Sequence, residues 1–251
     1  MRGVLTVGVA AAVVMTGVTP ASAGTPYQEK ITCPIGGEVF EHTSTGSWST
    51  FGARPDGKPY GSWIFPMPIP VCPSNKLPIY SKFSEGELAQ LKPLVASEEF
   101  RTFAAKNVPY RNAAWLMERT SAKPENIAWM ILQASWEADQ DPELKRGYQA
   151  DYVERLRALP QGPDEYDWLS YQARAANGLR ELGRFDESIT MIDMLSRRTA
   201  DAKEKAAGAA QNSASAKTLE KLGYLETFLG KLRQVSSAKD SSSEPAIFKV
   251  R

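Results

Sequence analysis

Proline and glycine divide this sequence into two parts that cannot fold in the same way. Between residues 24 and 83 both residues recur throughout, as in Arg54-Pro55-Asp56-Gly57-Lys58-Pro59 and Pro66-Met67-Pro68-Ile69-Pro70. Long helices are excluded here, because proline breaks a helix interior and glycine weakens it. Pro55-Asp56-Gly57 is a turn signal, since proline presets the first corner and glycine accepts a positive φ. We expect a compact, loop-rich head with short strands near residues 38–41, 48–51 and 62–65.

The sequence changes to a helical pattern at residue 84. Ser84 and Glu87 have the spacing of a capping box, and apolar residues then recur three or four positions apart. Pro124 and Pro142 fall at first-turn positions of later helices. We therefore predict a mainly α fold, either an array of helical hairpins or an irregular bundle. The helical domain would span residues 84–235, between a partly β head (24–83) and a flexible tail (236–251) rich in Ser, Lys and Asp.

The first residues have the three-part plan of a secretory signal peptide. Arg2 precedes an apolar run over residues 4–18, which ends in Pro20-Ala21-Ser22-Ala23. This run is shorter than the roughly 20 residues of a membrane-spanning helix, and we predict cleavage after Ala23. The mature chain would be periplasmic or secreted, with no membrane span. Cleavage removes a single charge, so the net charge of +1 falls to zero, which argues against nucleic acid as a partner.

Two cysteines, Cys33 and Cys72, lie in the predicted mature chain. In an oxidising compartment an even number of cysteines favours a disulfide. This bridge would close a loop of about 40 residues and stabilise the fold by about 4 kcal/mol. The alternative is a metal site in which His42 and either Glu38 or Glu41 complete the ligand set. Because neither CxxC nor HxxxH spacing supports that site, we predict the disulfide, with no metal and no cofactor.

Residues 171–195 place small residues, large apolar residues and a glycine turn where two packed helices need them. The matching positions are Ala176 and Ser188 (small), Leu179 and Ile192 (large), and Gly183 and Phe185 (turn). In this pattern the segment resembles a tetratricopeptide repeat, from which it departs at Gln172 and Leu195. The resemblance implies a helical hairpin within a protein-binding scaffold.

Two phrases of the head look alike: Cys33-Pro34-Ile35-Gly36 and Cys72-Pro73-Ser74-Asn75. In a zinc knuckle of the form Cys-Pro-x-Cys, Gly36 and Asn75 would both be cysteines. The head thus resembles a degenerate two-knuckle zinc ribbon and is similar to uncharacterised bacterial proteins with paired knuckles ahead of helical repeats. Four thiolates would hold zinc, whereas the remaining two are expected to form the disulfide.

The head is rich in aromatic residues. They are Tyr27, Phe40, Trp48, Phe51, Tyr60, Trp63, Phe65 and Tyr80. They can form the core of a small domain that is poor in aliphatic residues, or an exposed platform for a sugar or a peptide. For the second interpretation the candidate contacts are Trp48 and Trp63, which lie in the most turn-rich segments, together with Tyr60.

The sequence favours a non-enzyme, and we assign no catalytic residue. His42 is the only histidine, and no nucleophile, zinc-protease, P-loop or dinucleotide motif occurs. Carboxylates of the helical part, such as Glu137 and Asp139, could pair as in cell-wall lytic enzymes, but solvated helix faces carry such residues commonly. We predict an exported protein-interaction or scaffold module of unknown partner. The alternative is a cell-wall or polysaccharide-binding protein, with or without weak hydrolase activity.

Overall fold

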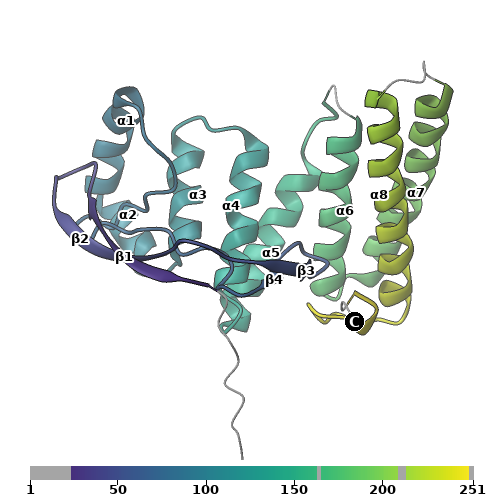
Figure 1. Ribbon diagram of the computed structural model, residues 1–251, viewed down its shortest axis with the longest axis horizontal. Coiled ribbons are helices and arrows are strands. Elements are labelled where there is room, and N and C mark those ends of the chain that lie inside the picture. The colour runs from purple at the N-terminus through teal and green to yellow at the C-terminus, as the bar shows by residue number, and fades with distance from the viewer. Residues whose placement is uncertain (1–23, 163–164, 209–212, 249–251) are drawn as a thin grey trace, which may run out of the picture.

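The computed structural model describes residues 24–162, 165–208 and 213–248, and this part of the chain is mainly helical (Figure 1). Here a small head of short strands precedes eight α-helices, which confirms the predicted fold class. The helices are α1 (Glu85–Ala96), α2 (Glu98–Ala104), α3 (Pro109–Arg119), α4 (Pro124–Glu137), α5 (Pro142–Arg157), α6 (Glu165–Glu181), α7 (Phe185–Gly208) and α8 (Ser213–Ser237). The predicted signal peptide, residues 1–23, lies outside the described residues.

The head contains two separate antiparallel hairpins. They pair β1 (Pro26–Thr32) with β2 (Val39–Thr45), and β3 (Thr50–Ala53) with β4 (Pro59–Gly61). The predicted strands at 38–41 and 48–51 overlap β2 and β3, but the prediction at 62–65 is wrong because β4 ends at Gly61. The sequence does not predict β1, because most of its side chains are exposed and no apolar alternation marks it.

Helices begin where the sequence provides local caps. Ser84 and Glu87 form the predicted capping box of α1, in which Ser84 N donates to Glu87 Oε2 at 2.7 Å. Proline lies in the first turn of α3, α4 and α5. The sequence does not predict α2 as a separate helix. Ser97 both ends α1 and caps α2, where its Oγ accepts a hydrogen bond from Phe100 N at 3.1 Å.

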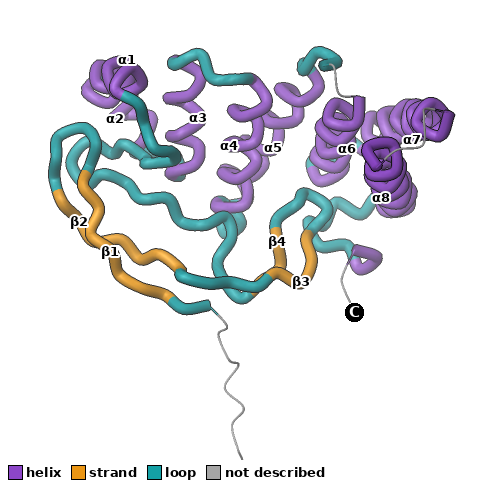
Figure 2. The backbone as a smooth tube through the Cα atoms, turned by 45° about the horizontal axis from the view of Figure 1, so that its top comes forward, coloured by secondary structure: helices purple, strands orange, loops and turns teal. Residues whose placement is uncertain are grey.

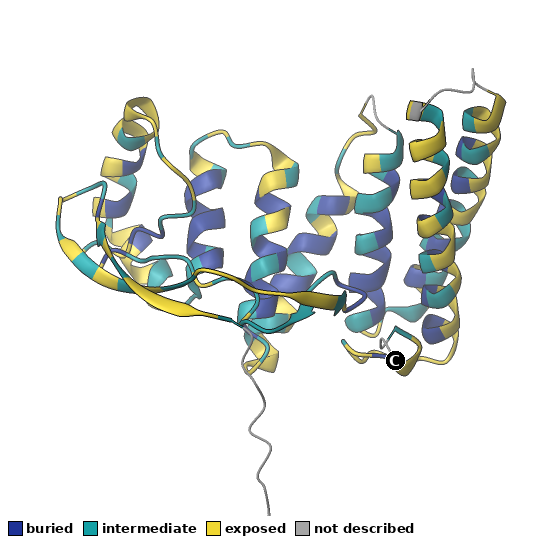
Figure 3. Ribbon diagram, in the orientation of Figure 1, coloured by how far each residue is buried: buried dark blue, intermediate teal, exposed yellow. Residues whose placement is uncertain are grey.

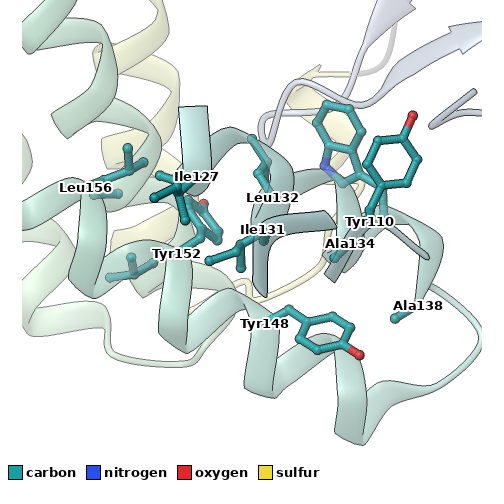
Figure 4. Close-up of a cluster of buried hydrophobic side chains, with 14 of the residues drawn as sticks. Tyr110, Ile127, Ile131, Leu132, Ala134, Ala138, Tyr148, Tyr152 and Leu156 are labelled. Carbon is teal, nitrogen blue, oxygen red and sulfur yellow. The ribbon is translucent and has the colours of Figure 1, made fainter. Parts of the chain in front are cut away.

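From α3 to α8 each helix packs against the next, and α6 also contacts α8 (Figure 2). One buried cluster joins α3 to α6 and includes Tyr110, Ile131 and Tyr152 (Figure 4). A second joins α6, α7 and α8. Helix α6 belongs to both, since Leu179 lies in the first and Leu169 in the second. Buried residues therefore continue through the whole array (Figure 3).

The head lies along one side of this array, from α1 and α2 toward α6 (Figures 1 and 2). A third buried cluster joins it to the first helices. In that cluster Cys33 and Cys72 pack with Leu91, Phe100 and Leu116. Head and helices thus share a core.

The helical hairpin predicted over residues 171–195 is formed by α6 and α7. Ala176 and Ser188 are fully buried where the two helices touch, and Ser188 Oγ donates to Ala176 O at 2.8 Å. Gly183 makes the turn with a φ of +78°, a conformation that favours glycine. Gln172 is buried and donates to Leu156 O at 2.6 Å, so it is accommodated by a hydrogen bond to α5.

The segment after α8 contacts the helices at two places. The fully buried Arg180 donates from Nη1 to Asp240 O at 2.6 Å and to Ser242 O at 2.8 Å. Further on, the 3-10 helix η1 (Ala246–Phe248) places Phe248 against Phe228 with ring centroids 5.7 Å apart. The tail predicted over residues 236–251 thus begins within α8, and its described residues contact the helices at these two places.

Candidate functional site

Cys33 and Cys72 form the predicted disulfide, with an S–S distance of 2.05 Å. The two Cys-Pro phrases around it have the same local fold. Cys33 N donates to Glu38 O at 2.8 Å and Cys72 N donates to Leu77 O at 2.9 Å. The backbone then turns through left-handed residues in both phrases, Gly37 (φ 73°) and Lys76 (φ 60°). The disulfide therefore joins two matching turns.

Gly36 and Asn75, each three positions after one of the cysteines, also approach each other. A Cβ added at Gly36 would lie 3.9 Å from Asn75 Nδ2. That amide donates to Ile35 O at 2.6 Å and so ties one turn to the other. Cys33, Gly36, Cys72 and Asn75 therefore lie close together in the folded head.

Among the described residues, the one group of possible metal ligands is Cys33, Cys72 and Glu38, whose ligand atoms lie within 4.8 Å of one another. His42 and Glu41, considered with them from the sequence, are not part of this group. Glu38 Oε1 accepts hydrogen bonds from Ser74 N at 2.9 Å and Ser74 Oγ at 2.8 Å. With both sulfurs in the disulfide, neither is a thiolate that could bind a metal.

The structure separates the three aromatic candidates of the head. Ser62 N donates to Ser49 O at 3.0 Å, which extends the β3–β4 pairing by one position. Trp48 and Trp63 lie just outside the two strands. Trp48 is 51% exposed, whereas Trp63 is partly buried and lies close to Gly24. Tyr60 lies within the hairpin, opposite Gly52.

The turn at residues 54–57 docks the head on the helices through buried charges. Gly57 has a φ of +90° and donates to Arg54 O at 2.9 Å, as the predicted turn requires. Arg54 is only 7% exposed, and its guanidinium donates to Asp56 Oδ2 at 2.6 Å and to Asp139 Oδ2 at 2.8 Å. Lys58 also contacts Asp139 Oδ2 at 2.6 Å. The head is thereby fixed to the residues that follow α4.

Asp139 receives a third cation from α5, because Lys145 Nζ donates to its Oδ1 at 2.6 Å. Burial favours the neutral form of this carboxyl, but hydrogen bonds from Lys145, Lys58 and Arg54 outweigh it and lower its pKa to about 2. The interpretation of Asp139 as part of a solvated face is therefore wrong. A carboxylate held in this way accepts protons poorly near neutral pH, which indicates a structural role.

Glu137 is a second carboxylate for which the interpretation as part of a solvated helix face is wrong. It accepts a hydrogen bond from Tyr110 N at 3.1 Å, at the first turn of α3. Burial raises its pKa, against the effect of this hydrogen bond. The carboxylate thereby satisfies a free amide at a helix start.

Glu181 has the most strongly raised pKa among the described carboxylates, about 7, because burial and the nearby Asp56 both disfavour its charge. Its Oε1 accepts from Asn177 Nδ2 at 2.8 Å, and its Oε2 accepts from Gln149 Nε2 at 2.6 Å. Ser243 Oγ, in the tail, donates to Oε2 at 3.3 Å. Through these hydrogen bonds Glu181 connects the tail to α5 and α6.

Two open hollows on the helices share three lining residues, and together they are here called the Phe103 groove. Their volumes are 560 Å³ and 670 Å³, and both are lined by Phe103, Lys106 and Asn107. The first is also lined by Glu98, Glu99, Thr102 and Trp115, and the second by Arg111, Asp141, Glu143, Leu144, Gly147, Tyr148 and Asp151. Sequence reasoning missed this groove, because it joins α2, α3 and α5 only after folding.

No protein-family model, curated protein or solved structure matches this chain. None of the helices in the described ranges combines the length and the apolar character that crossing a bilayer demands.

Proposed function

We propose that this chain is an exported protein-interaction module that binds an extended segment of a partner protein in the Phe103 groove. The observation that carries the proposal is that two open hollows lie side by side and share Phe103, Lys106 and Asn107 in their lining. Arrays of stacked helices commonly bind their partners in extended surface grooves. The signal-peptide pattern and the disulfide support an oxidising compartment outside the cytoplasm.

The lining of the groove suits a peptide chain. Phe103 is partly buried and offers apolar contact area in the first hollow, and the buried Trp115 packs beside it with the ring centroids 5.8 Å apart. In the second hollow Tyr148 Oη donates to Asn107 Oδ1 at 2.9 Å, which fixes the amide at the point where the hollows join. Asn107 and Tyr148 thus present polar groups beside apolar surface, as peptide-binding sites do.

Site-specific photo-crosslinking tests this proposal. A photoreactive residue replaces Lys106 in the groove, or Lys217 on the exposed surface of α8 as the control. We expect a discrete crosslinked partner from the groove position only. Thr102→Arg, at an exposed lining position, should block that crosslink without affecting folding. Equal crosslinking from both positions, or a crosslink that Thr102→Arg leaves unchanged, would contradict the proposal.

The alternative function, glycan binding by the head, is favoured by one observation. Trp48 exposes half of its surface just before β3. Aromatic side chains on a free surface can stack on sugar rings. Sedimentation with purified peptidoglycan distinguishes the two functions: retention that is lost in Trp48→Ala supports glycan binding, and no retention of the unchanged protein excludes it.

A further inference from the structure

A separate pocket lies where the head meets the last helices of the array. Its volume is 240 Å³, and it lies between the turn at residues 54–57 and helices α6 and α8. We call it the junction pocket. Its polar and aromatic lining consists of Arg54, Arg174, Ser170, Tyr166, Tyr224 and Phe228. No Asp or Glu of the described residues lines it, although two arginines do.

The two arginines differ in how their charge is compensated. Arg54 is paired with Asp56 and Asp139 at 2.6 and 2.8 Å. The described residues place no carboxylate within ion-pairing distance of Arg174, whose contacts are Asp56 O at 3.4 Å and the ring of Trp129 at 5.7 Å. Asp139 cannot balance this charge, since it is already shared by Arg54, Lys58 and Lys145. Arg174 therefore brings an uncompensated positive charge to the pocket.

Gly57 leaves the space that the guanidinium of Arg174 occupies. A Cβ added at Gly57 would overlap Arg174 Nη1, and the φ of +90° at this residue also disfavours any side chain. The turn thereby holds the arginine close to the head, where Arg174 Nη1 donates to Asp56 O at 3.4 Å and the side chain lines the pocket. Ser170, one turn before Arg174 on α6, adds a hydroxyl group to the same lining.

The opposite part of the lining is aromatic. Phe228 is partly buried against Phe248, while Tyr224 is 68% exposed and forms the rim. Lys221, one turn before Tyr224 on α8, places its Nζ 5.0 Å from the ring centroid of Tyr166. The pocket thus combines a cationic side, an apolar side and an open rim.

We propose that the junction pocket binds a carboxylate carried by an apolar group, with the carboxylate on Arg174 and the apolar group against Tyr224 and Phe228. Guanidinium and carboxylate groups form paired, charge-assisted hydrogen bonds. The volume of 240 Å³ is somewhat below the usual range of about 300–1,000 Å³ for small-molecule sites. It therefore suits either a small free acid or the C-terminal residue of a peptide, which share this chemistry.

Calorimetric titration of the full mature chain tests the site with two matched probes, 3-phenylpropanoate and its neutral analogue 3-phenylpropanamide. We expect the acid to bind at least about tenfold more tightly, as the loss of one charged hydrogen bond implies. Arg174→Gln should remove this preference, whereas Arg146→Gln, at an exposed position of α5, should leave it unchanged. Tyr224→Ala, at the exposed rim, should weaken both probes.

Equal binding of acid and amide, no binding of either, or the same loss in Arg146→Gln would overturn the proposal. If Arg174→Gln fails to fold, two other measurements still test the proposal. The comparison of acid and amide uses the unchanged protein, and Tyr224→Ala changes a largely exposed residue. A peptide ending in phenylalanine, with either a free or an amidated C-terminus, then identifies the source. Tighter binding of the free-ended peptide than of 3-phenylpropanoate indicates a peptide terminus, and weaker binding indicates a small acid.

Discussion

Replacing Asp139 with asparagine should weaken the ion pairs that attach the head to the helices and so lower the stability of the fold. The substitution keeps the size of the side chain but leaves Arg54, Lys58 and Lys145 without their shared anion. The pKa of Asp139 is about 2 in the folded protein, against an ordinary value of 3.8. This difference corresponds to about 2 kcal/mol of stability near neutral pH. We therefore expect Asp139→Asn to lower the free energy of unfolding at pH 7 by about 2 kcal/mol or more.

The sign of the pH dependence follows from the lowered pKa. The stabilising effect of Asp139 is fully present above about pH 4 and is lost as the pH falls toward 2. Of the roughly 2 kcal/mol, about 1 kcal/mol should be lost by pH 3. The difference in stability between the unchanged protein and Asp139→Asn should shrink accordingly between pH 7 and pH 3.

Urea unfolding, followed by circular dichroism at pH 7, 4 and 3, measures this difference. Asp201→Asn is the matched control, since Asp201 is an exposed carboxylate of α7 with no ion pair among the described residues. The control should change stability by less than about 0.5 kcal/mol at each pH. An equal effect of the two variants, or a difference that stays constant from pH 7 to pH 3, would show that the ion pairs of Asp139 do not stabilise the fold.

Three further variants test the disulfide, the close contact between α5 and α6, and the cap of α1. The double variant Cys33→Ala/Cys72→Ala should lose about 4 kcal/mol, because the bridge closes a loop with a sequence separation of 39; a urea midpoint equal to that of the oxidised protein would contradict this. Gly178→Ala should cost about 1–3 kcal/mol, since its Cβ would overlap Val153 Cγ2, and an unchanged melting temperature would show that α5 and α6 adjust freely. Ser84→Ala should cost about 1 kcal/mol by removing the cap of α1. Loss of helix content limited to α1, measured by hydrogen exchange, is the expected result, and unchanged protection there would count against it.

Features set by neighbouring residues could be predicted from the sequence. The cap at Ser84 and the turn at Gly57 each depend on a few residues, and the structure has both. The disulfide was also predictable, although its cysteines are 39 positions apart, because an even number of cysteines after a signal-peptide pattern favours pairing. Strand β1 and helix α2 were not, since the first shows no apolar alternation and the second begins directly at the end of α1.

Features that depend on distant residues could not be predicted. Arg54 and Asp139 are 85 positions apart, and Arg180 and Asp240 are 60 positions apart. Each of these residues alone is typical of a solvated turn, helix or tail. Only the folded chain removes them from water, and then each charge requires a partner. The Phe103 groove and the junction pocket could not be predicted for the same reason, because their walls come from elements that are distant in the sequence.

The contacts of Lys145 explain why the head and the tail form one unit with the helices. Its Nζ donates to Asp139 Oδ1 at 2.6 Å and to Ser243 Oγ at 2.9 Å, so a single side chain of α5 links the docked turn to the C-terminal segment. At its other end the head is held by the disulfide within the cluster of Leu91 and Leu116. The turn that carries Arg54 and Gly57 is therefore fixed in position, although its own hairpin is small. Because this turn forms one wall of the junction pocket, Asp139 supports the pocket without lining it.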